Sequence, residues 1–197
     1  MNKNVVIVVP KEIVLASKSP WRRRLLKKHG VLARIHISNF DEKKTGNPRA
    51  LVIHNACGKA ETVAKHYKNS IIIGVDTIGV YGKFVLGKPT DRAHAKKMLQ
   101  TLSGKRHKVI SGLCLIDTST GKKVSGSAVS YVTFRKLGKE ELEKYLDSGH
   151  YKGKAGSYAI QGRAKGFVER VEGEISNVVG LPIEYFKKML VDLSSPI

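Results

Sequence analysis

The stretch IVLASKSPWRRR, residues 13–24, joins a short apolar strand pattern to the start of a helix. Small hydroxyl residues follow the strand at Ser17 and Ser19, and Pro20 stands where a helix can begin, with Ser19 in the N-cap position. Arg22 to Arg24 then fall in the first helical turn, where a helix already presents unpaired N–H groups. Cations in that turn oppose the helix dipole, so the stretch predicts a bound anion, most simply phosphate; a solvated basic helix face is the alternative.

Strand and helix patterns alternate along the rest of the chain, which predicts an α/β fold. The continuous apolar run 71–75 is typical of a strand buried on both faces, and Asn47 with Pro48 predicts the start of a long helix. The other expected strands are 33–38, 78–81, 84–86, 109–117, 123–134, 158–160, 167–170 and 176–179, and the other expected helices are 90–102, 139–146 and 182–193. No linker is long enough to separate independent domains, so we expect a single domain over residues 1–197, with two lobes around a cleft.

Size and composition predict one enzyme-sized globular domain. The chain has 197 residues, 41% of them hydrophobic and 26% charged, without a low-complexity run or an internal repeat. No apolar run reaches the roughly 20 residues of a membrane span and no convincing signal peptide precedes Lys11, so we expect a cytoplasmic protein without membrane contact. Cys57 and Cys114 lie in apolar surroundings without CxxC spacing, which favours buried thiols over a disulfide or a metal site.

The formal net charge of +20 is the compositional outlier and is compatible with nucleic-acid binding. The lysines and arginines are spread along the whole chain, however, and only 7% of the residues are aromatic. No helix-turn-helix, zinc-finger, RRM or KH pattern is present in the sequence. We therefore expect the basic surface to attract polyanions in general, nucleotides included, and nucleic-acid binding not to be the main function.

Acidic residues are few, 16 against 36 basic ones, so the position of each is informative. Asp76 follows the apolar run 71–75, and open α/β sheets place ligands at the carboxyl ends of such strands. Asp41 and Glu42 lie in a polar loop, where they are either a solvated pair or, near a phosphate site, ligands for magnesium or manganese. Lys59 stands beside the apolar stripe of the helix that begins at Pro48, where a lysine usually extends its ammonium group to water.

Two segments rich in glycine add further candidates. The segment GKFVLGKP, residues 82–89, is similar to a phosphate-binding P-loop, but Pro89 replaces the Ser or Thr that would bind magnesium, which argues against that motif. Lys88 nevertheless follows the expected hairpin after Asp76 and can return to the same end of the sheet. The loop 149–156 and the segment YAIQG, residues 158–162, are either a flexible connection or a mobile wall over a ligand, in which Gln161 can hydrogen-bond a base edge.

These segments together resemble the Maf family, the nucleoside triphosphate pyrophosphatases once described as septum formation inhibitors. The resemblance covers nearly the whole chain, from Leu15 to about Leu190. It rests on LASKSPWRR at 15–23, Asp41-Glu42, Lys59 in the helix around 56–60, GVDT at 74–77, GKP at 87–89, LSG at 102–104, KAG at 154–156, YAIQG at 158–162 and NVVGLP at 177–182.

The resemblance implies a fold, a reaction and a set of site residues. The fold would be a mixed twisted α/β sheet in two lobes around a central nucleotide-binding cleft, of the Maf/ITPase-like kind. The reaction would be metal-dependent cleavage between the α- and β-phosphates of a nucleoside triphosphate by a homodimer, with Mg²⁺ or Mn²⁺ as cofactor. The implied catalytic residues are Asp76 as proton acceptor, Glu42, Lys59 and Lys88; the implied metal ligands are Glu42 and Asp76; the implied phosphate-binding residues are Ser17, Ser19, Arg22 and Arg23.

Three positions bear on the base that such a site would accept. The branch of the family that acts on dTTP and UTP resembles this chain at Thr77 and Gln161 but normally has arginine where Trp21 stands. The branch that acts on 7-methyl-GTP carries tryptophan there, but usually glutamine and glutamate at the other two positions. Two of the three markers therefore favour dTTP and UTP, with CTP or modified nucleotides open and 7-methyl-GTP as the alternative. A non-enzymatic nucleic-acid-binding or division-regulating protein is the alternative from another class.

Overall fold

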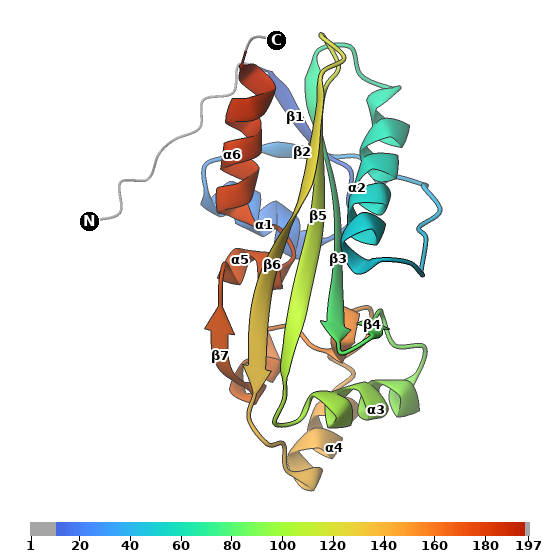
Figure 1. The fold of residues 1–197 in the computed structure, drawn as a ribbon, viewed down its shortest axis with the longest axis vertical. Helices are drawn as coiled ribbons and strands as arrows, with labels where there is room; N and C mark the ends of the chain where they lie inside the picture. Colours follow the sequence, from blue (N-terminus) through green and yellow to red (C-terminus); the bar gives the residue numbers. More distant parts are fainter. Residues whose placement is uncertain (1–10, 196–197) are drawn as a thin grey trace, which may run out of the picture. The chain divides into compact units, whose positions relative to one another are not determined.

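The computed structural model describes residues 11–195, and the apolar segment 5–10, a possible N-terminal extension, lies outside the described residues. The described chain is a mixed α/β protein, as the sequence predicted, with one seven-stranded sheet. The strand order is β2-β1-β3-β5-β6-β7, and β4 pairs with β3 (Figure 1). The strands are β1 (Glu12–Leu15), β2 (Ala33–Ile35), β3 (Ser70–Tyr81), β4 (Phe84–Leu86), β5 (Arg106–Asp117), β6 (Lys123–Phe134) and β7 (Val168–Glu172).

Strand pairing mixes both directions. β1 runs parallel to β2 and β3, whereas β4 is antiparallel to β3 and β7 is antiparallel to β6. The α-helices are α1 (Pro20–Lys28), α2 (Pro48–Ala64), α3 (Arg92–Leu102), α4 (Lys139–Asp147), α5 (Ile175–Val179) and α6 (Ile183–Ser194), and the 3-10 helices are η1 (Ala155–Ser157) and η2 (Arg163–Phe167). None of the helices in residues 11–195 combines the length and apolar character that a bilayer-spanning helix requires.

The chain divides into two compact units. The first consists of the described parts of Met1–Asp76, Ser111–Ala128 and Gly180–Ile197, and the second consists of Thr77–Ile110 and Val129–Val179. The strands β3, β5 and β6 each contribute residues to both units, so the chain passes between the units along strands rather than through loops.

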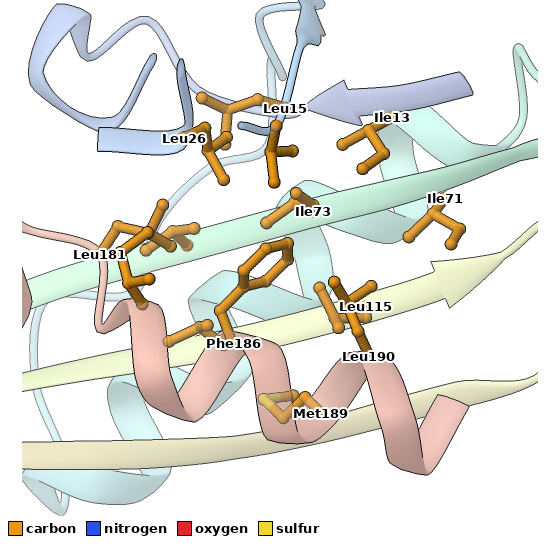
Figure 2. Close-up of a cluster of buried hydrophobic side chains, with 14 of the residues drawn as sticks. Ile13, Leu15, Leu26, Ile71, Ile73, Leu115, Leu181, Phe186, Met189 and Leu190 are labelled. Atoms are coloured by element: carbon orange, nitrogen blue, oxygen red, sulfur yellow. The ribbon is translucent and has the colours of Figure 1, made fainter. Parts of the chain in front are cut away.

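The first unit buries both faces of its part of the sheet. Successive residues of β1 point to opposite faces, so Ile13 and Leu15 enter one apolar cluster while Val14 enters another. Side chains from α1 and α6 complete the first cluster, with Phe186 of α6 packed against the strands (Figure 2). Apolar residues of α2, Ala56 among them, complete the second cluster. Burial on both faces explains why the strand sequences of this unit read as continuous apolar runs.

Glycines in the strands let α2 lie very close to the sheet. A Cβ atom on Gly74 would overlap the main-chain oxygen of Ala56, and one on Gly112 would overlap the main-chain oxygen of Val52 and lie 2.6 Å from the nitrogen of Ile53. The helix backbone therefore touches β3 and β5 where these strands have no side chain. The start of α2 is fixed as the sequence predicted, since the Asn47 side chain accepts hydrogen bonds from the main-chain N–H groups of Arg49 and Ala50.

The second unit has its own core. It gathers apolar residues of α3, α4, η2 and the unit's share of the strands, including Leu99, Phe134 and Phe167. Its aromatic rings meet edge to face, with 4.8 Å between the ring centroids of Phe134 and Tyr158. The Tyr158 hydroxyl lies 2.8 Å from Nε2 of the buried His107, which gives both polar groups a partner inside the core.

Three expectations about secondary structure were wrong. The strand expected at 71–75 continues as β3 to Tyr81, so Asp76 lies within a strand rather than at its end. The β-branched residues after Asp76 sustain the strand, and the turn comes only at Gly82, whose φ of 56° glycine adopts without strain. The expected strand 176–179 is the helix α5, and no strand forms at 158–160.

Tertiary contacts account for the last two differences. The Asn177 side chain is buried and donates hydrogen bonds to the Val109 main-chain oxygen and to Ser130 Oγ, both at 3.1 Å. These bonds hold the segment in a helical turn that its own β propensity does not favour. At Tyr158, the preceding residue Ser157 has a φ of 66°, which turns the chain out of an extended conformation. The Tyr158 ring packs in the core of the second unit, and its backbone does not pair with a strand.

Candidate active site

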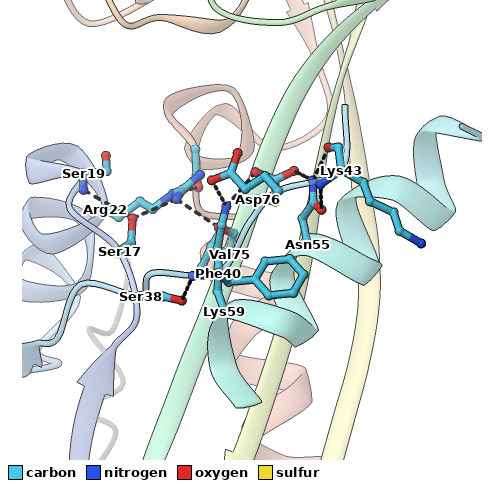
Figure 3. A network of polar contacts seen from close by, with 12 residues as sticks. Ser17, Ser19, Arg22, Ser38, Phe40, Lys43, Asn55, Lys59, Val75 and Asp76 are labelled. Carbon is cyan, nitrogen blue, oxygen red and sulfur yellow. Dashed lines mark hydrogen bonds and ion pairs between the residues drawn. The ribbon is translucent and has the colours of Figure 1, made fainter. Parts of the chain in front are cut away.

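The first unit contains a partly buried cluster of charged side chains centred on Lys59 of α2. The Lys59 ammonium nitrogen lies 2.9 Å from Asp76 Oδ1 and 2.8 Å from Glu42 Oε1, and it donates a 3.3 Å hydrogen bond to the Val75 main-chain oxygen (Figure 3). Lys59 is only 8% exposed and Asp76 only 7%. The usual extension of a lysine to water therefore does not occur here, because the helix lies too close to the sheet and two carboxylates face the ammonium group.

Asn55 binds Asp76 and the loop that carries Glu42, and it is not among the site residues that the sequence predicted. Its amide nitrogen donates 3.0 Å hydrogen bonds to Asp76 Oδ2 and to the Lys43 main-chain oxygen, and its amide oxygen accepts from the Lys43 N–H at 2.9 Å. One side chain thus fixes Asp76 and the loop that carries Glu42. Asn55 precedes Lys59 by one helical turn, and this i, i+4 spacing is the sequence signal that could have identified it.

The loop that carries Glu42 is anchored to α2 at a second point. The Phe40 ring lies against Gly58, where a Cβ atom would overlap the ring, and the Phe40 N–H donates a 3.1 Å hydrogen bond to Ser38 Oγ. Glu42 therefore reaches Lys59 from a loop held on both sides of it, at Phe40 and at Lys43. Its neighbour Asp41 is exposed, as the solvated reading of that residue expects.

Arg22 of α1 lies beside the cluster and is held by main-chain oxygens. Its Nε donates to the Gly180 oxygen at 2.8 Å, and its terminal nitrogen donates to the Val75 oxygen at 3.1 Å and to Ser17 Oγ at 2.9 Å. Burial lowers the pKa of Arg22, and the negative charges of Asp76 and Glu42 oppose that shift. The guanidinium is thus a fixed positive charge close to the two carboxylates.

The loop between β1 and α1 places Ser17 at this cluster. Ser17 Oγ accepts a 3.3 Å hydrogen bond from the Ser19 N–H as well as the bond from Arg22. The helix begins at Pro20 with Ser19 in the N-cap position, as predicted, but the Ser19 side chain makes no capping hydrogen bond. The Ser17 hydroxyl organises this turn instead.

The three consecutive arginines do not gather around one point. Arg22 points into the charged cluster, Arg24 stacks over the Trp21 ring with 4.8 Å between its Cζ and the ring centroid, and Arg23 lines a surface groove together with Lys27 and Arg34. Neighbouring residues of a helix point about 100° apart, so a run of three cannot share one face. The expectation that all three surround one anion was therefore wrong, and Arg22 alone reaches the cluster.

The remaining sequence candidates belong to the second unit. Thr77 follows Asp76 directly on β3. Lys88 follows Gly87, whose main-chain oxygen accepts a 3.0 Å hydrogen bond from the Gly156 N–H, so the two glycine-containing segments singled out in the sequence lie side by side within this unit. The Oε1 atom of Gln161 is buried and has no hydrogen-bond partner among the described residues, which is unusual for an amide oxygen.

Two carboxylates converge on one point in the first unit. Across residues 11–195, no group of three or more His, Cys, Asp or Glu side chains is arranged to hold a metal ion. Glu42 and Asp76 nevertheless both contact the same atom, Lys59 Nζ. A magnesium ion in a nucleotide-binding enzyme usually takes one or two carboxylates and obtains its other ligands from water and phosphate oxygens. The pair therefore fits an ion that arrives with a nucleotide better than a cage built by the protein alone.

An α/β fold with a buried lysine, an arginine and two carboxylates in one cluster is typical of an enzyme site. Residues 12–193 match the family described as Maf-like protein, so this chain belongs to the Maf family, as its sequence motifs indicated.

Curated relatives extend this finding. A protein of Desulforamulus reducens named dTTP/UTP pyrophosphatase is 44% identical over 173 residues, which are 87% of this chain and 91% of the relative. Relatives with the same name from Dictyoglomus thermophilum and Pelotomaculum thermopropionicum are 39% and 42% identical, each over 91% of this chain and 95% of the relative. The similarity therefore extends over nearly the full length of each protein.

Proposed function

We propose that this chain is a nucleoside triphosphate pyrophosphatase that hydrolyses dTTP and UTP between the α- and β-phosphates, releasing the monophosphate and pyrophosphate. The observation that carries the proposal is the cluster of Lys59, Asp76, Glu42 and Arg22, with Lys59 and Asp76 buried, in a member of the Maf family. The relatives named dTTP/UTP pyrophosphatase, 39% to 44% identical over most of both chains, support the choice of substrate. We further propose that the enzyme acts in the cytoplasm and that it is a homodimer. Light scattering of the purified protein tests the oligomeric state.

The proposed cofactor is Mg²⁺ or Mn²⁺, with Glu42 and Asp76 as its protein ligands. Such an ion, when bound, would offset the charge of the phosphates and polarise the α-phosphoryl group. Their shared contact with Lys59 Nζ supports this assignment, because it shows that both carboxylates reach one point. The ammonium group of Lys59 carries three donors on a flexible stem, so it can donate to a phosphate oxygen as well as to the carboxylates.

Asp76 is the proposed proton acceptor for the attacking water. Its two oxygens already accept from Lys59 and Asn55, and these bonds fix the plane of the carboxylate. A carboxylate has about four lone-pair positions, so lone pairs remain for a water molecule. Asp76→Asn keeps the shape of the side chain but removes its negative charge, so we expect this variant to bind nucleotide and to lose most of its turnover. Turnover at the parent rate would contradict the assignment.

Phosphate binding is proposed for Arg22 and Ser17, and on sequence resemblance alone for Ser19, Arg23 and Lys88. The main-chain contacts of Arg22 hold its positive charge in place before substrate binds, so little reorganisation is needed to offset phosphate charge. The groove location of Arg23 weakens its case. Arg23→Gln and Lys88→Gln test these two residues separately through the KM for the nucleotide.

Base selection is proposed for Gln161, Thr77 and Trp21. The buried Oε1 of Gln161 has no partner among the described residues. The N3–H group of uracil or thymine can donate a hydrogen bond to such an oxygen. A neutral amide also suits an uncharged base, whereas the cationic 7-methylguanine would gain more from a carboxylate and from stacking on an aromatic ring such as Trp21.

The decisive experiment is pyrophosphate detection with dTTP, UTP, CTP, GTP and 7-methyl-GTP, each with magnesium, with manganese and with EDTA. We expect metal-dependent release of pyrophosphate from dTTP and UTP. Release of pyrophosphate from 7-methyl-GTP alone would assign the chain to the other branch of the family. No release from any nucleotide, combined with salt-sensitive binding to DNA or RNA, would favour the non-enzymatic nucleic-acid-binding or division-regulating alternative.

A further inference from the structure

The two cysteines of the chain, which lie far apart in the sequence, meet in the first unit. Cys114 of β5 is fully buried among Val14, Ala56 and Ile72. Cys57 of α2 packs against the same apolar cluster and is only partly buried. The sequence predicted two buried thiols without a disulfide, and both thiols are indeed free, but the exposed part of Cys57 gives solvent access to one member of the pair.

The close contact between α2 and β5 explains why these cysteines meet. Gly112 lies against the Val52 main chain, so helix and strand backbones touch at that point. From there, two residues along β5 advance about 6.6 Å to Cys114, and five residues along α2 advance about 7.5 Å to Cys57. Further on, Glu61 of α2 pairs with Lys123 of β6 at 2.9 Å, which shows that the helix stays on this part of the sheet.

The two thiols belong to one apolar cluster and shift each other's pKa in opposite directions, which divides their roles. A hydrogen bond with Cys114 lowers the pKa of Cys57 to about 7, helped by Ser125 and the charge of Lys123 and opposed by burial and Glu61. The same hydrogen bond and burial raise the pKa of Cys114. Near neutral pH a large fraction of Cys57 is therefore thiolate, the reactive form of cysteine, while Cys114 keeps its proton.

We propose that Cys57 and Cys114 form an oxidation site, in which Cys57 reacts with a peroxide and Cys114 then closes a disulfide within the chain. In the first step the Cys57 sulfur attacks one peroxide oxygen; an S–O bond forms, the O–O bond breaks, and the departing hydroxide takes a proton from solvent to become water. Sulfur loses two electrons and the peroxide gains them. In the second step the Cys114 sulfur attacks the Cys57 sulfur; the S–S bond forms, and the S–O bond breaks as hydroxide leaves with the Cys114 proton as a second water.

The contact geometry suits this second step. A disulfide needs Cα atoms about 4.4–6.8 Å apart, which a helix reaches over a strand only when no bulky side chain separates the backbones. Gly112, two residues before Cys114, lets the backbone of α2 lie against β5 at Val52. The bond would tie β5 to the part of α2 that carries Asn55 and Lys59, each two residues from Cys57.

Thiol chemistry on the full chain tests the proposal. The chain has only two cysteines, so a count of free thiols reports on these two residues alone. The protein is treated with hydrogen peroxide, free thiols are counted with a colorimetric disulfide reagent in denaturant, and peptides are analysed by mass spectrometry without reduction. We expect both thiols to disappear together, with a peptide linking Cys57 to Cys114 in a protein of unchanged monomer mass. Loss of one thiol without this link, or a link between two chains, would overturn the proposal.

Two single variants separate the roles of the cysteines. In Cys114→Ala, the Cys57 sulfenic acid has no resolving thiol, so it should accumulate and be trapped by dimedone. In Cys57→Ser, a substitution at a partly exposed position, we expect the Cys114 thiol to react at least about tenfold more slowly than the first thiol of the parent. Equal rates in Cys57→Ser and the parent, with circular dichroism showing both folded, would contradict the assignment of Cys57 as the attacking thiol.

Discussion

Asn55 offers a quantitative test of the site, because one side chain bridges Asp76 and the loop that carries Glu42. Its three hydrogen bonds comprise two neutral ones with the Lys43 main chain and one to the charged Asp76. Neutral bonds contribute about 1 kcal/mol each and a bond to a charged group about 1.5–3 kcal/mol. Since Asn55 is only 2% exposed, bulk water does not replace these bonds, and Asn55→Ala should lower the free energy of unfolding by about 3.5–5 kcal/mol.

The same change should slow catalysis, because Asp76 and Glu42 lose the group that orients them. We expect kcat for dTTP hydrolysis to fall about 100-fold, the order of loss that follows a small misplacement of reacting groups. Asn55→Asp is the matched near-isosteric variant: it can still accept from the Lys43 N–H, but it replaces the donor that faces Asp76 with a second acceptor. It should therefore lose turnover as well while keeping the size of the side chain.

Urea denaturation and pyrophosphate release, both at a temperature where every variant is fully folded, measure the two effects. Asn47→Ala is the control, since it makes the same substitution on the same helix but removes only the cap at the start of α2. It should cost about 1 kcal/mol and leave kcat unchanged. Our account of Asn55 would be refuted by parent-like turnover in Asn55→Ala, or by a loss of stability no larger than that of the Asn47 control.

Further predictions concern packing, pH and base selection. Gly112→Ala should lower the melting temperature and cost about 3 kcal/mol or more, because its Cβ overlaps the Val52 main chain, which cannot move as a flexible side chain could. Burial lowers the pKa of His107 from its ordinary 6.5 to about 4, so the unfolded chain binds the proton first and stability falls as pH drops from 6.5 toward 4. The full effect is about 3 kcal/mol, and it should disappear from pH-dependent urea titrations of His107→Gln. Gln161→Glu should raise the KM for UTP and dTTP, because a charged carboxylate matches the O4 and O2 acceptors of these bases poorly; an unchanged KM would remove Gln161 from base recognition.

Local signals in the sequence predicted the features that depend on neighbouring residues. Pro20 and the pair Asn47-Pro48 fixed the starts of α1 and α2, because capping and the fixed φ of proline act within a few residues. The apolar run 71–75 predicted a strand that is buried on both faces, because this pattern too lies within a few neighbouring residues. The family motifs also predicted the mixed α/β fold and the Maf family.

Features that depend on contacts distant in sequence could not be predicted in this way. The pattern around Lys59 indicated a lysine extended to water, whereas the folded chain places two carboxylates against it. The only signal for Asn55 was its i, i+4 spacing to Lys59, since its partners lie on a loop and a strand distant in sequence. The three arginines were grouped by their adjacency in the sequence, although the turn of the helix separates them.

The close packing of α2 links these observations. Lys59 and Asn55 of α2 both contact Asp76 in the middle of β3. They can do so because Gly74, two residues before Asp76, lets the helix backbone touch the strand at Ala56. A side chain at Gly74 would push α2 outward and would lengthen the bonds from both residues to Asp76. We therefore interpret Gly74 as a residue that sets the geometry of the candidate site, although it carries no functional group itself.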